Sequence, residues 1–175
     1  DLANGLCERG NDVHLAIFER GLDQIDRVQS NVRFHELRRR SRADWSLVRA
    51  LAGVIDDNRV EVVLGVMQYS ALTAYLAARI SRCRPPVVAG IHTTANVGIK
   101  EELQDRLIYR SMLGRLPAVI FVCESQRKFW LQRFPELRTN CHVIHNGVDT
   151  ARFMRADFRS PAQRLRMELD IPAEA

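Results

Sequence analysis

Polar residues suited to hydrogen bonding or proton transfer directly follow several apolar segments of this sequence. The sharpest candidate is His92, which comes after Val87–Ile91, because an imidazole changes charge near neutral pH. A histidine satisfied by loop backbone is the alternative. Further candidates follow apolar segments in the same way: Thr93, Glu124, Asn146, Gly147 and Asp149. If the segments are parallel strands, their carboxyl ends share one edge of a sheet, which predicts a cleft for a polar ligand there.

The spacing of the other reactive residues predicts no familiar catalytic or metal site. No Ser-His-Asp or Cys-His arrangement, G-x-G-x-x-G loop or phosphate-binding P-loop is present. His14 and His35 fall inside apolar segments, which favours a structural role. Glu124 is equally suited to capping a helix and to touching a ligand. The cysteines form no C-x-x-C pair, which predicts buried thiols in a reducing compartment: Cys7, Cys83, Cys123 and Cys141.

Basic residues outnumber acidic ones by 26 to 21, which gives a net charge of +5, and they are densest near residue 40. The cluster consists of Arg38, Arg39, Arg40 and Arg42, and Trp45 follows it. Such a cluster is able to bind phosphate on a lipid headgroup or a nucleic acid. A solvated loop in an arginine-rich protein is the alternative interpretation.

Strand-like and helix-like segments alternate along the chain. Apolar runs predict strands at 13–18, 32–37, 60–66, 87–91, 118–123 and 141–145, and apolar residues spaced three or four apart predict helices between them. The polar alternation of 32–37 predicts a strand near an edge. Because the other strands are apolar on both faces, we expect a doubly wound α/β domain with a parallel sheet covered on both sides.

The pattern changes toward both ends of the sequence. The chain opens on a helix, whereas such domains start with a strand and a tight turn, so we expect a first strand to be missing. We expect an acceptor-side domain over 1–158 and the start of a linker to a second domain over 159–175. No apolar run approaches the roughly 20 residues that a membrane-spanning helix needs.

Five segments, in order, resemble glycosyltransferase family 4, a large retaining group with the GT-B fold. VIHNGVDTARF at 143–153 resembles the family's V-I-x-N-G-V-D-x-x-x-F segment and is the most specific of them. The opening LANGLCERGNDVHLAIF is similar to the family's first helix and second strand, with Asn11 where His is common. GIHTTANV, VIFVCESQRKFW and RLRMELDIPAEA are similar to a strand-end histidine, a strand-to-helix step in which Cys123 replaces Ser, and the lead into the second domain.

The resemblance implies a Rossmann-like acceptor half of a retaining enzyme that moves a sugar from a nucleotide-sugar to a glycan or lipid-linked acceptor without a metal or other cofactor. It places His92 beside the transferred sugar as the catalytic residue. Thr93, Glu124, Asn146, Gly147 and Asp149 would line the cleft. The four clustered arginines would contact anionic membrane or an acceptor phosphate from the cytoplasmic side. We expect this half alone to be inactive, because the donor half is not in the sequence.

Two other classes of protein compete with this interpretation. A noncatalytic nucleic-acid-binding α/β domain agrees with the net charge, but the sequence shows no aromatic–basic interleaving. An NAD(P)-dependent oxidoreductase or a sugar-nucleotide epimerase would need an acidic residue closing the second strand, and Glu19 is the one candidate.

Overall fold

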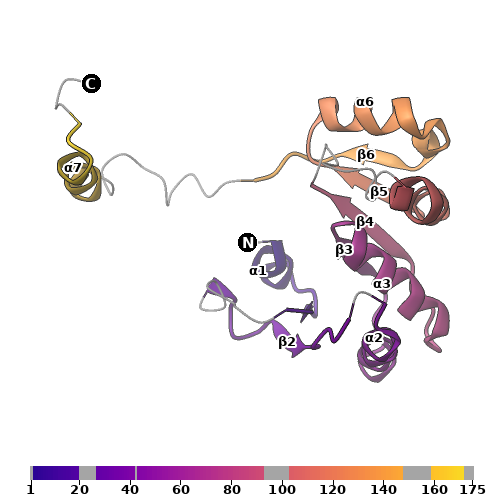
Figure 1. Cartoon of the computed structure of the whole chain (residues 1–175). Helices are drawn as coiled ribbons and strands as arrows, with labels where there is room; N and C mark the ends of the chain where they lie inside the picture. The colour runs from indigo at the N-terminus through magenta and orange to yellow at the C-terminus, as the bar shows by residue number, and fades with distance from the viewer. Residues whose placement is uncertain (1, 20–26, 42, 93–102, 148–158, 172–175) are drawn as a thin grey trace. The chain divides into compact units, whose positions relative to one another are not determined.

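The computed structural model describes residues 2–19, 27–41, 43–92, 103–147 and 159–171. The chain divides into two compact units, Asp1–Ile144 and His145–Ala175. The larger unit is α/β and contains all of the strands assigned in the described residues. Figure 1 shows its helices and strands.

Two strands near the start of the chain form a small parallel sheet. After α1 (Leu2–Glu8), β1 (His14–Ile17) pairs with β2 (Arg33–Glu36), and His14 lies opposite Arg33 in the register. Among the described residues β2 pairs with β1 alone, so the predicted edge position of this segment is confirmed.

Four further strands form a second parallel sheet in the order β3-β4-β5-β6. Their bounds are Val63–Val66, Val87–Ile91, Ala118–Phe121 and Cys141–Val143. The strand predicted to begin at Val60 begins at Val63, because Val60 donates its backbone N–H to the Ile55 carbonyl (3.0 Å) and so closes the preceding helix. Arg59 makes this possible with a left-handed φ of 49°.

Helices connect consecutive strands of the second sheet, as parallel pairing requires. They are α3 (Gln68–Ile80), η2 (Asp105–Tyr109), α5 (Arg110–Leu113), α6 (Glu124–Arg133) and η3 (Pro135–Thr139). A further helix, α2 (Trp45–Asp57), connects β2 of the first sheet to β3. Asp44 caps α2 by accepting from the N–H groups of Ser46 and Leu47. The segment from Asp105 to Tyr109 has π-helical hydrogen bonding.

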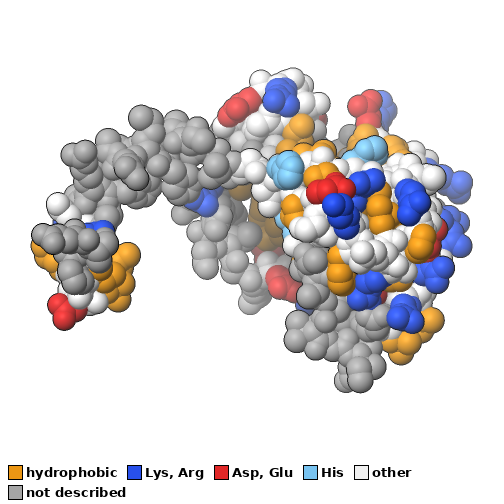
Figure 2. Space-filling model, turned by 90° about the horizontal axis from the view of Figure 1, so that it is seen from above, with side chains coloured by type: hydrophobic (Ala, Val, Ile, Leu, Met, Phe, Trp, Pro, Cys, Tyr) orange, Lys and Arg blue, Asp and Glu red, His pale blue; other side chains and the backbone are white. Residues whose placement is uncertain are grey.

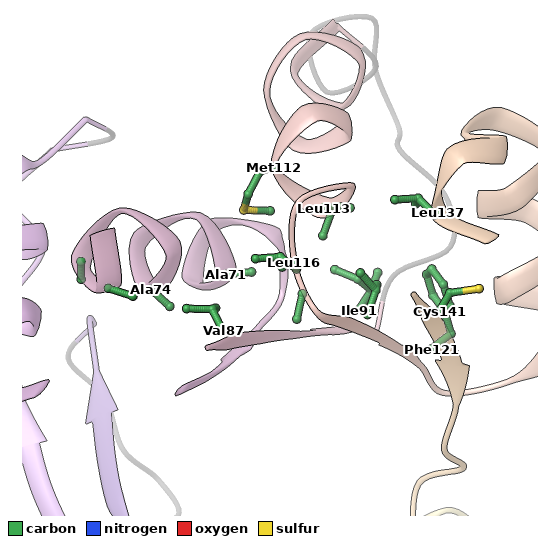
Figure 3. Close-up of a cluster of buried hydrophobic side chains, with 14 of the residues drawn as sticks. Ala71, Ala74, Val87, Ile91, Met112, Leu113, Leu116, Phe121, Leu137 and Cys141 are labelled. Atoms are coloured by element: carbon green, nitrogen blue, oxygen red, sulfur yellow. The ribbon is translucent and has the colours of Figure 1, made fainter. Parts of the chain in front are cut away.

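The core of the larger unit lies between the second sheet and the helices that cover it (Figure 3). Ala71, Ala74 and Ala77 let α3 approach β3 and β4 closely, since alanine adds a single methyl group. Gly65 of β3 permits the closest approach: a Cβ on this residue would lie 2.4 Å from Cα of Ala71.

The smaller unit contains one assigned helix in its described residues, α7 (Arg159–Glu168). In this helix Met167 is 81% exposed, and Leu165 is also exposed. None of the helices in the described parts of either unit is long and apolar enough to cross a bilayer.

Candidate functional site

His92 follows the carboxyl end of β4, at the edge of the second sheet where the sequence placed it. Its side chain is exposed. The ring atom Nε2 lies 3.8 Å from the position that a Cβ on Gly90 would occupy, so the imidazole lies over the glycine of its own strand. The exposed imidazole is therefore open to a ligand at the edge of the sheet.

Glu124 lies one strand away from His92, where β5 passes into α6. Its carboxylate accepts from Nη1 of Arg127 (2.7 Å), one turn further along the helix, and its side chain is 49% exposed. Glu124 is the first residue of α6, and the capping position before it is taken by Cys123. The structure thus gives Glu124 an ion pair in the first helical turn, where a negative charge is favourable.

The strand-to-helix step before Glu124 is fixed by two side chains that follow it. Oε1 of Gln126, which is fully buried, accepts from the backbone N–H of Val122 (2.9 Å). The hydroxyl of Ser125 lies 3.1 Å from Sγ of Cys123. This hydroxyl and the N–H groups of Gln126 and Ser125 lower the pKa of the Cys123 thiol.

Side chains that follow β1, β2 and β3 contact one another beyond the carboxyl ends of these strands. Phe18 follows β1, Arg39 follows β2 and Tyr69 follows β3. The Arg39 guanidinium lies 4.9 Å from the centre of the Tyr69 ring, and Phe18 meets the same ring edge-on at 6.4 Å. These contacts join the edges of the two sheets within the larger unit.

The arginine cluster borders a cavity of about 940 Å³ at this edge. Arg38 pairs with Glu36 (3.2 Å), and Arg39 pairs with Glu19 (2.5 Å). The backbone N–H of Arg40 donates to Asp44 (2.7 Å). Basic side chains on the face of the larger unit in Figure 2 likewise lie interspersed with apolar and acidic ones. The cluster is therefore partly neutralised by its neighbours, and its contact with membrane or phosphate stays a prediction.

Asp44 connects this cavity to the start of α2. Its pKa is lowered to about 2, first by the hydroxyl of Ser46 and then by the backbone N–H groups of Arg40, Leu47 and Ser46. The carboxylate is thus ionised at neutral pH and joins Arg40 to the first turn of α2 through hydrogen bonds.

A buried carboxylate lies in the helical segment before β5. Asp105 is 3% exposed. Partial burial of Tyr109 raises the pKa of its hydroxyl, and the charges of Asp105 and Tyr69 raise it further. Sequence reasoning did not single out this aspartate, because it falls within an amphipathic helical pattern where acids are normally solvated.

The positions of the remaining predicted site residues relative to His92 and Glu124 are not described by the structure. Thr93, Asp149 and Arg42 lie outside the described residues. Asn146 and Gly147 are exposed and belong to the smaller unit. Their roles at the cleft stay predictions.

Sequence reasoning also missed the clustering of Phe18, Glu19, Glu36 and Tyr69. Each of them ends a strand or follows one within three positions, which is the signal in the sequence that marks them. Within the parts of the chain that the structure describes, no group of three or more His, Cys, Asp or Glu side chains is placed to hold a metal ion.

The fold and its polar edge define a class of protein. The structure is similar to the crystal structure of a glycosyltransferase from Rickettsia africae ESF-5, with a TM-score of 0.71 and 18% sequence identity. The match covers 98% of this chain and 45% of that one, so this chain spans less than half the length of that protein. At this identity the likeness shows a shared α/β, Rossmann-like fold.

The sequence gives the family. The sequence model of Glycosyltransferase Family 4 matches residues 1–152, and the chain belongs to this family. No curated protein sequence matches it. The resemblance to this family is thereby confirmed.

Proposed function

We propose that this chain is the acceptor-binding part of a retaining glycosyltransferase that transfers a sugar from a nucleotide-sugar to a glycan or glycolipid. The family match over residues 1–152 carries the proposal. The exposed His92 at the carboxyl end of β4 supports it, because ligands of open parallel sheets bind at this edge.

The chemistry of such a transfer explains why an exposed histidine at the edge of a sheet is useful. Departure of a nucleoside diphosphate leaves an oxocarbenium-like sugar, and the enzyme must stabilise the leaving group and orient the acceptor hydroxyl. We assign the second task to this chain. His92 would hydrogen-bond the transferred sugar and the incoming hydroxyl from its exposed position after β4. We place this activity at the cytoplasmic side of a membrane and expect it to need no metal ion.

A thermal-shift screen of the intact protein against nucleotide-sugars, without added metal, tests this function. A donor that binds the native state alone raises the melting temperature. Transfer from that donor is then followed by NMR, and we expect the anomeric configuration to be retained. Stabilisation by NAD(P) or DNA, with no response to any nucleotide-sugar, would contradict the proposal and favour an oxidoreductase or a nucleic-acid-binding domain.

Substitution of His92 tests its role within the same assay. His92→Ala should lower kcat/KM by about a hundredfold, as loss of a positioned proton-transfer group does, while the donor still raises the melting temperature. His142→Ala is the matched control, because His142 is also exposed but lies within β6. Equal activity of the two variants would remove His92 from the reaction.

A further inference from the structure

The cavity beside the arginine cluster has the size and position of a binding site in the larger unit. It lies beyond the carboxyl ends of β1 and β2 and reaches the first turns of α2. Its volume of about 940 Å³ falls in the range of small-molecule sites. The lining side chains used below are Phe18, Glu19, Glu36, Arg38, Arg39 and Arg40.

The charges of this cavity are arranged in pairs. Glu36 accepts from Nε of Arg38, and Glu19 accepts from Nη2 of Arg39. Two of the three lining arginines therefore have a carboxylate partner before any ligand arrives. A phosphate would have to compete with these carboxylates for the guanidinium groups and would be repelled by them, since both anions seek the same donors.

The paired groups keep unused hydrogen-bonding capacity that faces solvent. An ionised carboxylate offers about four acceptor sites and a guanidinium five N–H donors, and one pairing contact uses a fraction of each. The side chains of Glu36 and Arg38 are 45% and 62% exposed, so their remaining acceptors and donors are open. A sugar hydroxyl both donates and accepts. Neighbouring hydroxyls therefore match an alternating set of carboxylates and guanidiniums without bringing net charge.

Aromatic contacts fix the inner pair and add an apolar wall. Arg39 is held between Glu19 and the face of Tyr69, and Phe18 packs edge-on against the same tyrosine. The guanidinium is thereby ordered before a ligand binds, which reduces the entropy that binding must overcome. Phe18 lines the cavity and offers apolar surface to the C–H groups of a sugar ring.

We propose that this cavity binds the acceptor through its neutral sugar hydroxyls, with Glu19 and Glu36 accepting hydrogen bonds and Arg38 and Arg39 donating them. This inference depends on the proposed function, and it names the chemistry of the acceptor: an uncharged, polyhydroxylated sugar unit. Arg38 and Arg39, which the sequence predicted to contact phosphate or membrane, would donate hydrogen bonds to it instead.

The test measures binding of two matched sets of probes to the intact protein by saturation-transfer NMR and calorimetry. One set consists of the methyl glycosides of glucose, galactose, mannose and N-acetylglucosamine; the other of the corresponding sugar 1-phosphates and inorganic pyrophosphate. At least one neutral glycoside should bind with an affinity that changes little between about 50 and 500 mM NaCl, because no net charge is involved.

Substitutions of the two glutamates should change glycoside affinity and phosphate affinity in opposite directions. Glu36→Ala and Glu19→Ala should each weaken glycoside binding about tenfold, since each removes charged acceptor atoms. Both would strengthen phosphate binding instead, because each frees a guanidinium. Glu136→Ala is the control, as Glu136 forms a comparable exposed ion pair with Arg110 away from this cavity. Unchanged circular dichroism would show that all variants fold.

The outcomes separate this inference from the proposed function. Binding of a nucleotide-sugar without binding of any neutral glycoside overturns the inference and leaves the function. Preference for the sugar phosphates, lost at high salt and enhanced by Glu36→Ala, also overturns it, as does salt-sensitive retention on anionic vesicles that competes with the glycosides. Lack of response to every nucleotide-sugar would instead remove the function itself.

Discussion

At the scale of single residues, the neighbours of Cys123 and Cys83 shift the pKa values of the two thiols in opposite directions. Cys83 is exposed, but partial desolvation and the neighbouring Asp56 carboxylate raise its pKa. Cys123 is less exposed, but hydrogen bonds from Ser125 and Gln126 lower its pKa. The thiolate is the reactive form, so the pKa and not the exposure should set the order of reaction.

We therefore predict that iodoacetamide labels Cys123 faster than Cys83 at pH 8. Quantitative peptide mass spectrometry over a time course measures both rates in one sample. Ser125→Ala removes the first contributor to the shift and should slow labelling of Cys123 while leaving Cys83 unchanged. Faster labelling of Cys83 in the unsubstituted protein would show that access outweighs thiolate character here.

At the scale of elements, the packing of α3 on β3 depends on one glycine. A Cβ at residue 65 would lie 2.4 Å from Cα and 2.8 Å from the backbone N of Ala71, and backbone atoms have no rotamer by which to move away. Gly65→Ala should therefore lower the free energy of unfolding by about 1–3 kcal/mol, the usual range for overpacking.

Gly53 provides the matched control for this substitution. It lies inside α2, and nothing lies within 4 Å of the position of its Cβ. Gly53→Ala should stabilise the protein by about 1 kcal/mol, because alanine is the better helix former. Chemical denaturation measures both variants, and a loss of stability in both would contradict this account of the interface.

A pair of histidines joins β1 and β2, and it predicts that the stability of the protein depends on pH. Nδ1 of His14 lies 2.9 Å from Nε2 of His35, so one nitrogen must be unprotonated, and Arg33 and Asp12 also contact His14. Burial, followed by the charges of His14 and Arg33, lowers the pKa of His35 below its ordinary value of 6.5. The unfolded chain then binds more protons than the folded one in acid.

Stability from this pair should be fully present above about pH 6.5 and should be lost as the pH falls toward the folded-state pKa of His35. Melting temperatures measured between pH 5 and 8 check this. His35→Gln should flatten the acid side of the profile, whereas His142→Gln, an exposed position on β6, should leave its slope unchanged. Equal slopes in all three proteins would exclude the histidine pair as the cause.

At the scale of the whole molecule, the family match and the structural match differ in reach. The family model covers residues 1–152 of this chain. The structural match covers 98% of this chain but 45% of the similar glycosyltransferase. We predict that this chain by itself gives no sugar transfer above background, because the diphosphate leaving group would have no stabilising partner. A radiolabelled-donor assay compares it with the intact protein, and turnover by the chain alone would show that it holds the donor as well.

The sequence by itself determined the fold class and the family. Apolar segments alternating with amphipathic ones encode parallel strands and covering helices, because both patterns depend on local spacing. His92 was found in the same way, since a residue directly after a strand must lie at the edge of its sheet. Boundaries were less secure: Val60 reads as strand, but a hydrogen bond to Ile55 places it in the end of α2.

Only the tertiary structure decided what the arginine cluster is. In sequence it is a run of uncompensated positive charge. In the folded chain Arg39 meets Glu19 and Tyr69, residues that follow two other strands, and Arg38 meets Glu36. The contacts of Arg39 join residues 20 or more positions apart, and both ion pairs depend on side-chain rotamers. No periodicity along the chain records these, so the chemistry of the cavity emerged only when the strands were placed side by side.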